Sequence, residues 1–209
     1  MNNQISNTLN NLSESETLAM TRLSRELIAE GKDVISLSIG EPDFDTPEFI
    51  KDAAKKAIDD NYTHYTPVPG YSELRNAIST KFKRDNNLDY SPDQIVVSTG
   101  AKHSLANISI SLLNPDDEVI LPAPYWVSYR EIVKIPGAKP VEIPSSIDQD
   151  FKVSIAQIKA AITDKTRMIW FSTPCNPSGS VYTKDELHDI AQLIKEYSNK
   201  DTTEGEAML

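Results

Sequence analysis

Val119-Ile120-Leu121-Pro122-Ala123-Pro124-Tyr125-Trp126, residues 119–126, joins a short apolar run to a proline-rich turn that ends on two aromatic side chains. Three more apolar runs lie at residues 95–97, 141–143 and 168–171, and segments with helical spacing separate them. Strands that alternate with helices indicate right-handed crossovers and a mainly parallel sheet. The sequence therefore predicts an α/β fold, a three-layer sandwich with helices on both faces of the sheet.

The C-terminal end of the chain departs from this alternation. A helix pattern that includes Leu187, Ile190 and Ile194 precedes residues 198–209, which are mostly polar and show no strand pattern. A crossover helix normally returns to a strand within a few residues. We therefore expect the sheet to be incomplete and the chain to be cut short.

Composition limits the functions that this chain can have. The 209 residues are 39% hydrophobic and 25% charged, with a net charge of -10. An acidic chain is a poor match for nucleic acid, which needs clustered Lys and Arg. No apolar run is long enough to cross a bilayer, and residues 1–11 lack the features of a signal peptide. With the single cysteine Cys175, this predicts a cytoplasmic protein that binds neither membrane nor nucleic acid.

Three clusters follow predicted strands, where a parallel sheet binds its ligands. Residues 98–102 begin a helix, and all of them except Lys102 have small side chains. This composition suits either a phosphate site or a tight turn. Trp126 either stacks on a flat ring or simply packs. Asn176, between Pro174 and Pro177, either offers its amide to a ligand or forms an Asx turn.

Other reactive side chains give weaker signals. The histidines His64, His103 and His188 are scattered and lack metal-ligand spacing, so no metal site is predicted. Cys175 has no patterned catalytic partner, which favours a small lining residue over a reactive thiol.

Taken in order, five motifs make the pattern specific. They are SIGEPDF (38–44), YTPVPG (65–70), TGAK (99–102), PYWVSY (124–129) and NPSG (176–179). The chain resembles the N-terminal part of class I aminotransferases of pyridoxal-phosphate (PLP) fold type I, in the bacterial aspartate aminotransferase subgroup. The resemblance runs from about residue 34 to 197, roughly the first half of that family's chain. It implies an N-terminal arm and small-domain helical segment at 1–45, a partial PLP-binding large domain at 46–200, and a tail outside the family at 201–209.

The resemblance implies two sets of site residues. Around PLP it implies Gly100, Ala101 and Lys102 at the phosphate, Trp126 on the pyridine ring, Asn176 at the phenolic oxygen, and Tyr65 at the phosphate of a partner subunit. Around the substrate it implies Gly40 and Asn176 at the α-carboxylate, Trp126 beside it, and Lys102 at a distal carboxylate. The last contact points to aspartate or glutamate.

The family's remaining site residues have no counterpart here. Its Asp at the pyridine nitrogen, Schiff-base lysine and C-terminal arginine all fall beyond the matched part. In the family a Tyr lies three residues after that Asp; Asp59 and Tyr62 have this spacing, but they end a polar helix. Thr99 and Lys102 have the spacing of the Ser-x-x-Lys pattern around the Schiff-base lysine, but the resemblance makes Lys102 a substrate contact. The resemblance thus implies no catalytic residue in this chain.

The predicted function is transamination between an acidic amino acid and a 2-oxo acid by a full-length homodimer, with this chain inactive alone. Two alternatives stay open. One is another PLP chemistry on the same fold, such as a lyase or decarboxylase. The other is a truncated, non-catalytic product or a fragment that dimerises with a full-length subunit.

Overall fold

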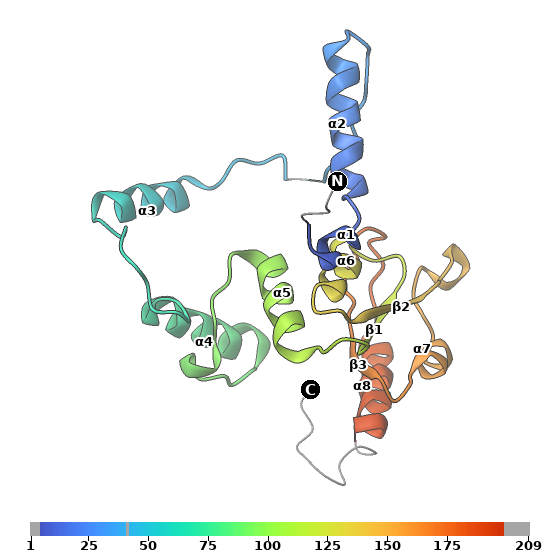
Figure 1. Cartoon of the computed structure of the whole chain (residues 1–209). Coiled ribbons are helices and arrows are strands. Elements are labelled where there is room, and N and C mark those ends of the chain that lie inside the picture. Colours follow the sequence, from blue (N-terminus) through green and yellow to red (C-terminus); the bar gives the residue numbers. More distant parts are fainter. Residues whose placement is uncertain (1–4, 41, 199–209) are drawn as a thin grey trace. The chain divides into compact units, whose positions relative to one another are not determined.

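The computed structural model describes residues 5–40 and 42–198 (Figure 1). These residues divide into two compact units. The sheet unit comprises Met1–Met20 and Ser104–Leu209, and the helical unit comprises Thr21–His103. The two sequence positions at which the units meet fall inside helices, one in α2 (Glu16–Ala29) and one in α5 (Gly100–Leu112). The predicted boundaries at 45 and 200 follow the family's domains and stay a prediction, and the tail at 201–209 lies outside the described residues.

The sheet unit is built on three parallel strands. They are β1 (Glu118–Pro122), β2 (Lys139–Ile143) and β3 (Thr166–Ile169), in the order β2-β1-β3. Ile120 at the centre of β1 is opposite Val141 on one side and Ile169 on the other. The backbone N–H of Trp170 donates to the carbonyl of Ile120 at 2.9 Å, which extends the pairing past β3. The α/β class and the parallel sheet are confirmed.

Helices pack against both faces of this sheet. The sheet unit contains α1 (Asn7–Asn10), most of α5, α6 (Ser128–Lys134), the 3₁₀ turn η2 (Ile147–Gln149), α7 (Ile155–Ala161) and α8 (Lys184–Ser198). Successive strand residues point to opposite faces. Val119 and Leu121 therefore pack with residues of α5 and α6, while Ile120 packs with residues of α7 and α8. These two cores and the sheet between them form the three layers.

The helical unit contains α3 (Glu48–Asp59), α4 (Ser72–Asn86), the 3₁₀ turn η1 (Pro92–Gln94) and most of α2. Among its described residues, Ile95 alone is buried. Among the glycines described in this unit, only Gly70 has close neighbours: its φ is +96°, and an added Cβ would lie 2.8 Å from Cγ2 of Val97. Glycine is required there because a side chain would be strained and would also overlap Val97.

The prediction of a strand at 95–97, parallel to the run at 119–121, is wrong. This segment leaves η1 with extended backbone at Ile95, but the N–H of Val97 donates to the carbonyl of Pro69 at 3.0 Å, in a loop. β1 is already paired along both of its edges, by β2 and β3, so it has no edge to offer.

None of the helices in the described ranges combines the length and the apolar character that crossing a membrane requires.

Candidate active site

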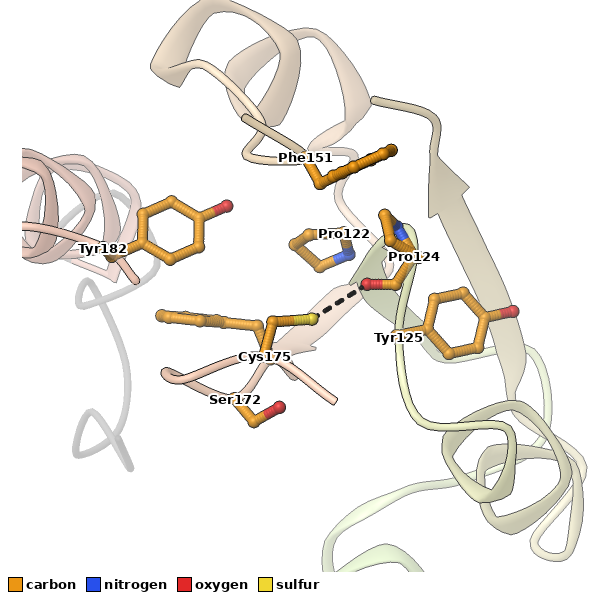
Figure 2. A pocket seen from close by; sticks show the side chains of 8 residues that line it. Pro122, Pro124, Tyr125, Phe151, Ser172, Cys175 and Tyr182 are labelled. Atoms are coloured by element: carbon orange, nitrogen blue, oxygen red, sulfur yellow. Dashed lines mark hydrogen bonds between the residues drawn. The ribbon is translucent and has the colours of Figure 1, made fainter. Parts of the chain in front are cut away.

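Two strand-end loops meet at the carboxyl edge of the sheet. β1 leads into the loop that carries Trp126, and β3 leads into the loop that carries Asn176. The thiol of Cys175 donates to the carbonyl of Pro124 at 3.3 Å and holds the two loops side by side (Figure 2). A parallel sheet places the ends of its strands at one edge, so the topology brings these distant segments together.

The loop around Asn176 is fixed by its own hydrogen bonds. The N–H of Asn176 donates to Oγ of Ser172 at 3.2 Å, and the N–H of Cys175 donates to the carbonyl of Ser180 at 2.9 Å. The N–H of Gly179 closes the turn onto the carbonyl of Cys175 at 2.7 Å. Asn176 itself is exposed, so an ordered backbone presents it to solvent.

Trp126 is half-buried and rests on an aromatic cluster. Its ring meets Tyr129 edge to face, with centroids 5.6 Å apart and planes at 84°. Tyr129 stacks with Tyr125 at 6.4 Å and meets Trp170 edge to face at 5.9 Å. The sequence motif identifies Trp126, but nothing in the spacing of these residues reveals Tyr129 as the ring common to all three contacts.

A shallow hollow lies between the loops (Figure 2). It is lined by Pro122, Pro124, Tyr125, Phe151, Phe171, Ser172, Cys175 and Tyr182. Burial raises the pKa of Tyr125 to about 12, and the negative charge and hydrogen bond of Glu142 add to this effect. The phenol is therefore neutral at pH 7. Glu142 also forms an ion pair with Arg130 on α6, with 3.2 Å between Oε1 of Glu142 and Nε of Arg130.

An ion pair lies beside the hollow: Lys152 follows Phe151 of the lining, and its Nζ is 5.9 Å from the ring centroid of Tyr182. Lys152 Nζ lies 2.8 Å from Oε1 of Glu186, at the start of α8. The hydrogen bond from Lys152 lowers the pKa of Glu186, and the same bond raises the pKa of Lys152. The phenolic oxygen of Tyr182 accepts from the N–H of Val153 at 3.0 Å, and burial raises the pKa of this phenol. The loop before α7 is thereby tied to the segment before α8.

In the helical unit, the predicted phosphate turn begins α5. Gly100 has φ +78°, and no atom lies within 4 Å of the place where its Cβ would stand. The N–H of Gly100 donates to the carbonyl of Ser98 at 2.9 Å, and the N–H of Thr99 donates to Nδ1 of His103 at 3.1 Å. Ala101 and Lys102 follow Gly100 in the first turn of α5.

This turn fits a phosphate group. Its glycine leaves open space, its first-turn amides point out of the helix, and the helix dipole favours negative charge. Lys102 is exposed on the same turn. Gly100 already donates its N–H to the carbonyl of Ser98, which the sequence motif alone does not indicate.

The two remaining predicted residues are also in the helical unit. Gly40 is exposed, with nothing within 4 Å of an added Cβ, and Tyr65 is fully exposed. The structure thus brings Trp126 and Asn176 to one edge of the sheet unit. Their convergence with Gly40, Tyr65 and the turn at 100–102 stays a prediction.

Among the described residues, no group of three or more His, Cys, Asp or Glu side chains is arranged to hold a metal ion.

Comparison with known proteins identifies the family. The sequence model described as "Aminotransferase class I and II" matches residues 32–199. The chain belongs to this family. Among its relatives are the aspartate aminotransferase of Bacillus sp. (strain YM-2), 48% identical over 94% of this chain and 50% of the relative, and the aspartate/prephenate aminotransferase of Cereibacter sphaeroides, 48% identical over 91% of this chain and 48% of the relative.

Solved structures agree with this assignment. The aspartate aminotransferase from Rhizobium meliloti aligns with a TM-score of 0.88 at 41% identity, over 93% of this chain and 48% of that one. The Thermus thermophilus aspartate aminotransferase with maleate aligns with a TM-score of 0.88 at 38% identity, over 92% of this chain and 50% of that one. This family member therefore has the aminotransferase fold, and it spans about half the length of the relatives it matches.

Proposed function

We propose that this chain supplies the phosphate turn, the ring stack and part of the carboxylate site of a PLP-dependent aminotransferase. The observation that carries the proposal is the contact between Cys175 and Pro124, 3.3 Å from Sγ to O, which aligns the loops of Trp126 and Asn176. The family's motifs assign both of these residues to the cofactor site. An aromatic face and an exposed amide at one sheet edge are suited to a flat, polar heterocycle.

Each group of residues has a separate binding role. The amides of Ala101 and Lys102 and the dipole of α5 bind the cofactor phosphate. Trp126 stacks on the ring, and Asn176 donates a hydrogen bond to the phenolic oxygen. When bound, PLP supplies a carbonyl carbon that accepts the amino group and a ring that withdraws electrons from the reacting carbon.

The proposed substrates are an acidic amino acid, aspartate or glutamate, and a 2-oxo acid. The relatives are aspartate and aspartate/prephenate aminotransferases, and the Thermus thermophilus structure is one with maleate, a dicarboxylate. The family's motifs assign both Gly40 and Asn176 to the α-carboxylate. The ammonium of Lys102 holds the distal carboxylate.

The remaining expectations concern assembly and location. Tyr65, which is fully exposed, reaches the phosphate site of a second subunit in a homodimer. A cytoplasmic location agrees with a single cysteine and with relatives that act on amino acids.

Residues 1–209 contain no lysine that the family's motifs assign to the proton transfer, so we expect them neither to form a stable covalent bond with PLP nor to catalyse turnover. The test is to mix the purified chain with PLP, reduce with borohydride, and map labelled lysines by mass spectrometry. Weak labelling over several surface lysines, without conversion of aspartate and 2-oxoglutarate, is the expected result. Stoichiometric labelling of one lysine together with turnover overturns it.

Substrate choice is tested by supplying the C-terminal half of a relative in trans. The C-terminal half of the Bacillus subtilis relative, 48% identical over the shared part, is co-expressed with this chain. Lys102→Ala should weaken use of aspartate and glutamate by about 1.5–3 kcal/mol relative to an apolar amino acid, the value of a charge-assisted hydrogen bond. Lys184→Ala, at another exposed lysine, is the control. Equal losses for acidic and apolar substrates contradict the role of Lys102.

A further inference from the structure

Tyr129 occupies a central position behind the proposed ring stack. It is the second residue of α6 and only 8% exposed. Its ring stacks with that of Tyr125, with planes at 12°, and meets those of Trp126 and Trp170 edge to face, with planes at 84° and 75°. Its backbone N–H also donates to the carbonyl of Trp126 at 2.9 Å. Tyr129 therefore contacts Trp126 through both its ring and its backbone.

The far end of this aromatic cluster is anchored in the sheet. Trp170 is 8% exposed, and its backbone N–H donates to the carbonyl of Ile120 in β1 at 2.9 Å. Its indole Nε1–H donates to Sδ of Met168 at 3.3 Å. Both the backbone and the ring of Trp170 are thus fixed, so the orientation of Tyr129 is set by the sheet core and not by the loop alone.

An edge-to-face pair of aromatic rings is energetically favourable in that geometry, so it disfavours rotation of either ring away from it. Trp126 is half-buried and lies in a loop, where an indole has more rotational freedom than in a core. A ligand that stacks on a mobile ring must first order it, and this ordering weakens binding. A ring already held in one orientation removes that cost.

We propose that Tyr129 is a positioning residue that fixes the plane of the Trp126 indole before any ligand binds. The ligand class is a flat aromatic ring, whose identity as PLP rests on the proposed function. The order of the indole itself does not rest on it. Tyr129 does not touch the ligand; it acts only through Trp126.

The order of Trp126 can be measured without a ligand. The chain has two tryptophans, so incorporation of 5-fluorotryptophan gives two ¹⁹F signals, which Trp170→Phe assigns. The variants are Tyr129→Phe, which keeps the ring, and Tyr129→Leu, which removes it. Ile132→Ala is the matched control, because Ile132 lies on the same helix and in the same core at 6% exposure but is aliphatic. Tyr129→Met fills more of the space and replaces Tyr129→Leu where that variant does not fold.

We expect the Trp126 signal to be unchanged in Tyr129→Phe and to broaden or move at least halfway to its unfolded position in the ring-less variant. Ile132→Ala should lower the unfolding temperature but leave the Trp126 signal in place. A Trp126 signal that stays sharp and unshifted without the Tyr129 ring overturns the proposal. So does an equal change in Ile132→Ala, because it would reflect general loosening of the core.

A second readout separates this proposal from the proposed function. PLP affinity of the chain, measured by titration, should fall about twofold to tenfold in the ring-less variant, the equilibrium equivalent of one aromatic pair, and should recover in Tyr129→Phe. An unchanged affinity in a variant whose Trp126 signal has moved overturns the positioning role. If the unaltered chain does not bind PLP, the proposed function fails, and the ¹⁹F spectra still decide whether Tyr129 orders Trp126.

Discussion

The sheet unit and the helical unit use similar helices but bury very different amounts of apolar surface. α8 in the sheet unit buries Ile190 and Leu193 in the core that contains Ile120 of β1. α3 in the helical unit is at least as amphipathic in sequence, yet it has no buried residue, and Phe49 and Ile58 are 74% and 68% exposed. The same periodicity therefore accompanies two different degrees of burial.

Helical spacing thus predicts an element but not its stability. An amphipathic stripe favours a helix, whereas most helical stability in proteins comes from the surface against which that stripe packs. In the sheet unit the parallel strands supply such a surface on both faces, and Val119, Ile120 and Leu121 are completely buried. Folding free energy should therefore be concentrated in the sheet unit, and the following predictions test that contrast.

The largest effect is expected from one isoleucine in the sheet unit. Ile158 on α7 is completely buried beside Ile120, so Ile158→Ala should lower the free energy of unfolding by about 2–5 kcal/mol. Ile58→Ala removes the same atoms from the exposed face of α3 and should change it by no more than about 0.5 kcal/mol. Urea unfolding followed by circular dichroism measures both. Equal losses at the two positions contradict the contrast.

Within the helical unit, the most sensitive position should be a glycine. Gly70 and Gly31 both have positive φ, +96° and +81°, so alanine at either position is strained by about 1–2 kcal/mol. Gly70→Ala should cost about 1–3 kcal/mol more, because its Cβ would lie 2.8 Å from the side chain of Val97, whereas nothing lies within 4 Å at Gly31.

Hydrogen exchange of the helical unit's amides reports this difference. Gly70→Ala should accelerate exchange around residues 69–71 and 95–98, and adding Val97→Ala should restore much of the protection by making room. If Gly31→Ala and Gly70→Ala have the same effect, the close approach to Val97 does not stabilise the unit.

Three of the four predicted strands are present in the structure, because each is an apolar run set between regular helical segments. The runs at 119–121, 141–143 and 168–171 all lie within or overlap β1, β2 and β3. The fourth run, at 95–97, has equally apolar residues, but pairing depends on a free edge elsewhere in the chain. In the structure the N–H of Val97 donates to the carbonyl of Pro69 in a loop, a contact that no sequence pattern indicates.

The candidate site likewise has parts that the sequence predicts and parts that it does not. Strand-end position and family motifs are enough to predict the loops of Trp126 and Asn176, and the structure aligns them through Cys175 and Pro124. Tyr129 and Ser172 could not be predicted, because their roles depend on ring geometry and on a loop folding back on itself. Such contacts join residues whose identities carry no distinctive spacing.

The smallest expected effect concerns one ion pair in each unit. Lys152 and Glu186 join segments 34 residues apart in the sheet unit, with the lysine side chain only 17% exposed. Lys56 and Asp60 in the helical unit are four residues apart on α3, with side chains 74% and 43% exposed. An exposed pair within one helix contributes little, whereas a pair that closes a loop over a core restricts the chain more. Glu186→Gln should therefore lower stability slightly but measurably, and Asp60→Asn should not.

The dependence on pH separates these two cases further. The pKa of Glu186 is below its ordinary value of 4.5 because Lys152 donates a hydrogen bond to it. A carboxyl group with a lowered folded-state pKa stabilises the fold above the unfolded value and loses that contribution as the pH falls through the folded value. Stability differences between the chain and Glu186→Gln should therefore be constant from neutral pH down to about pH 5 and should vanish in more acid solution. Thermal unfolding across this range measures them. A difference that persists at low pH would mean that the Gln side chain disturbs packing near α8. The charge of Glu186 would then not be what links the loop before α7 to α8.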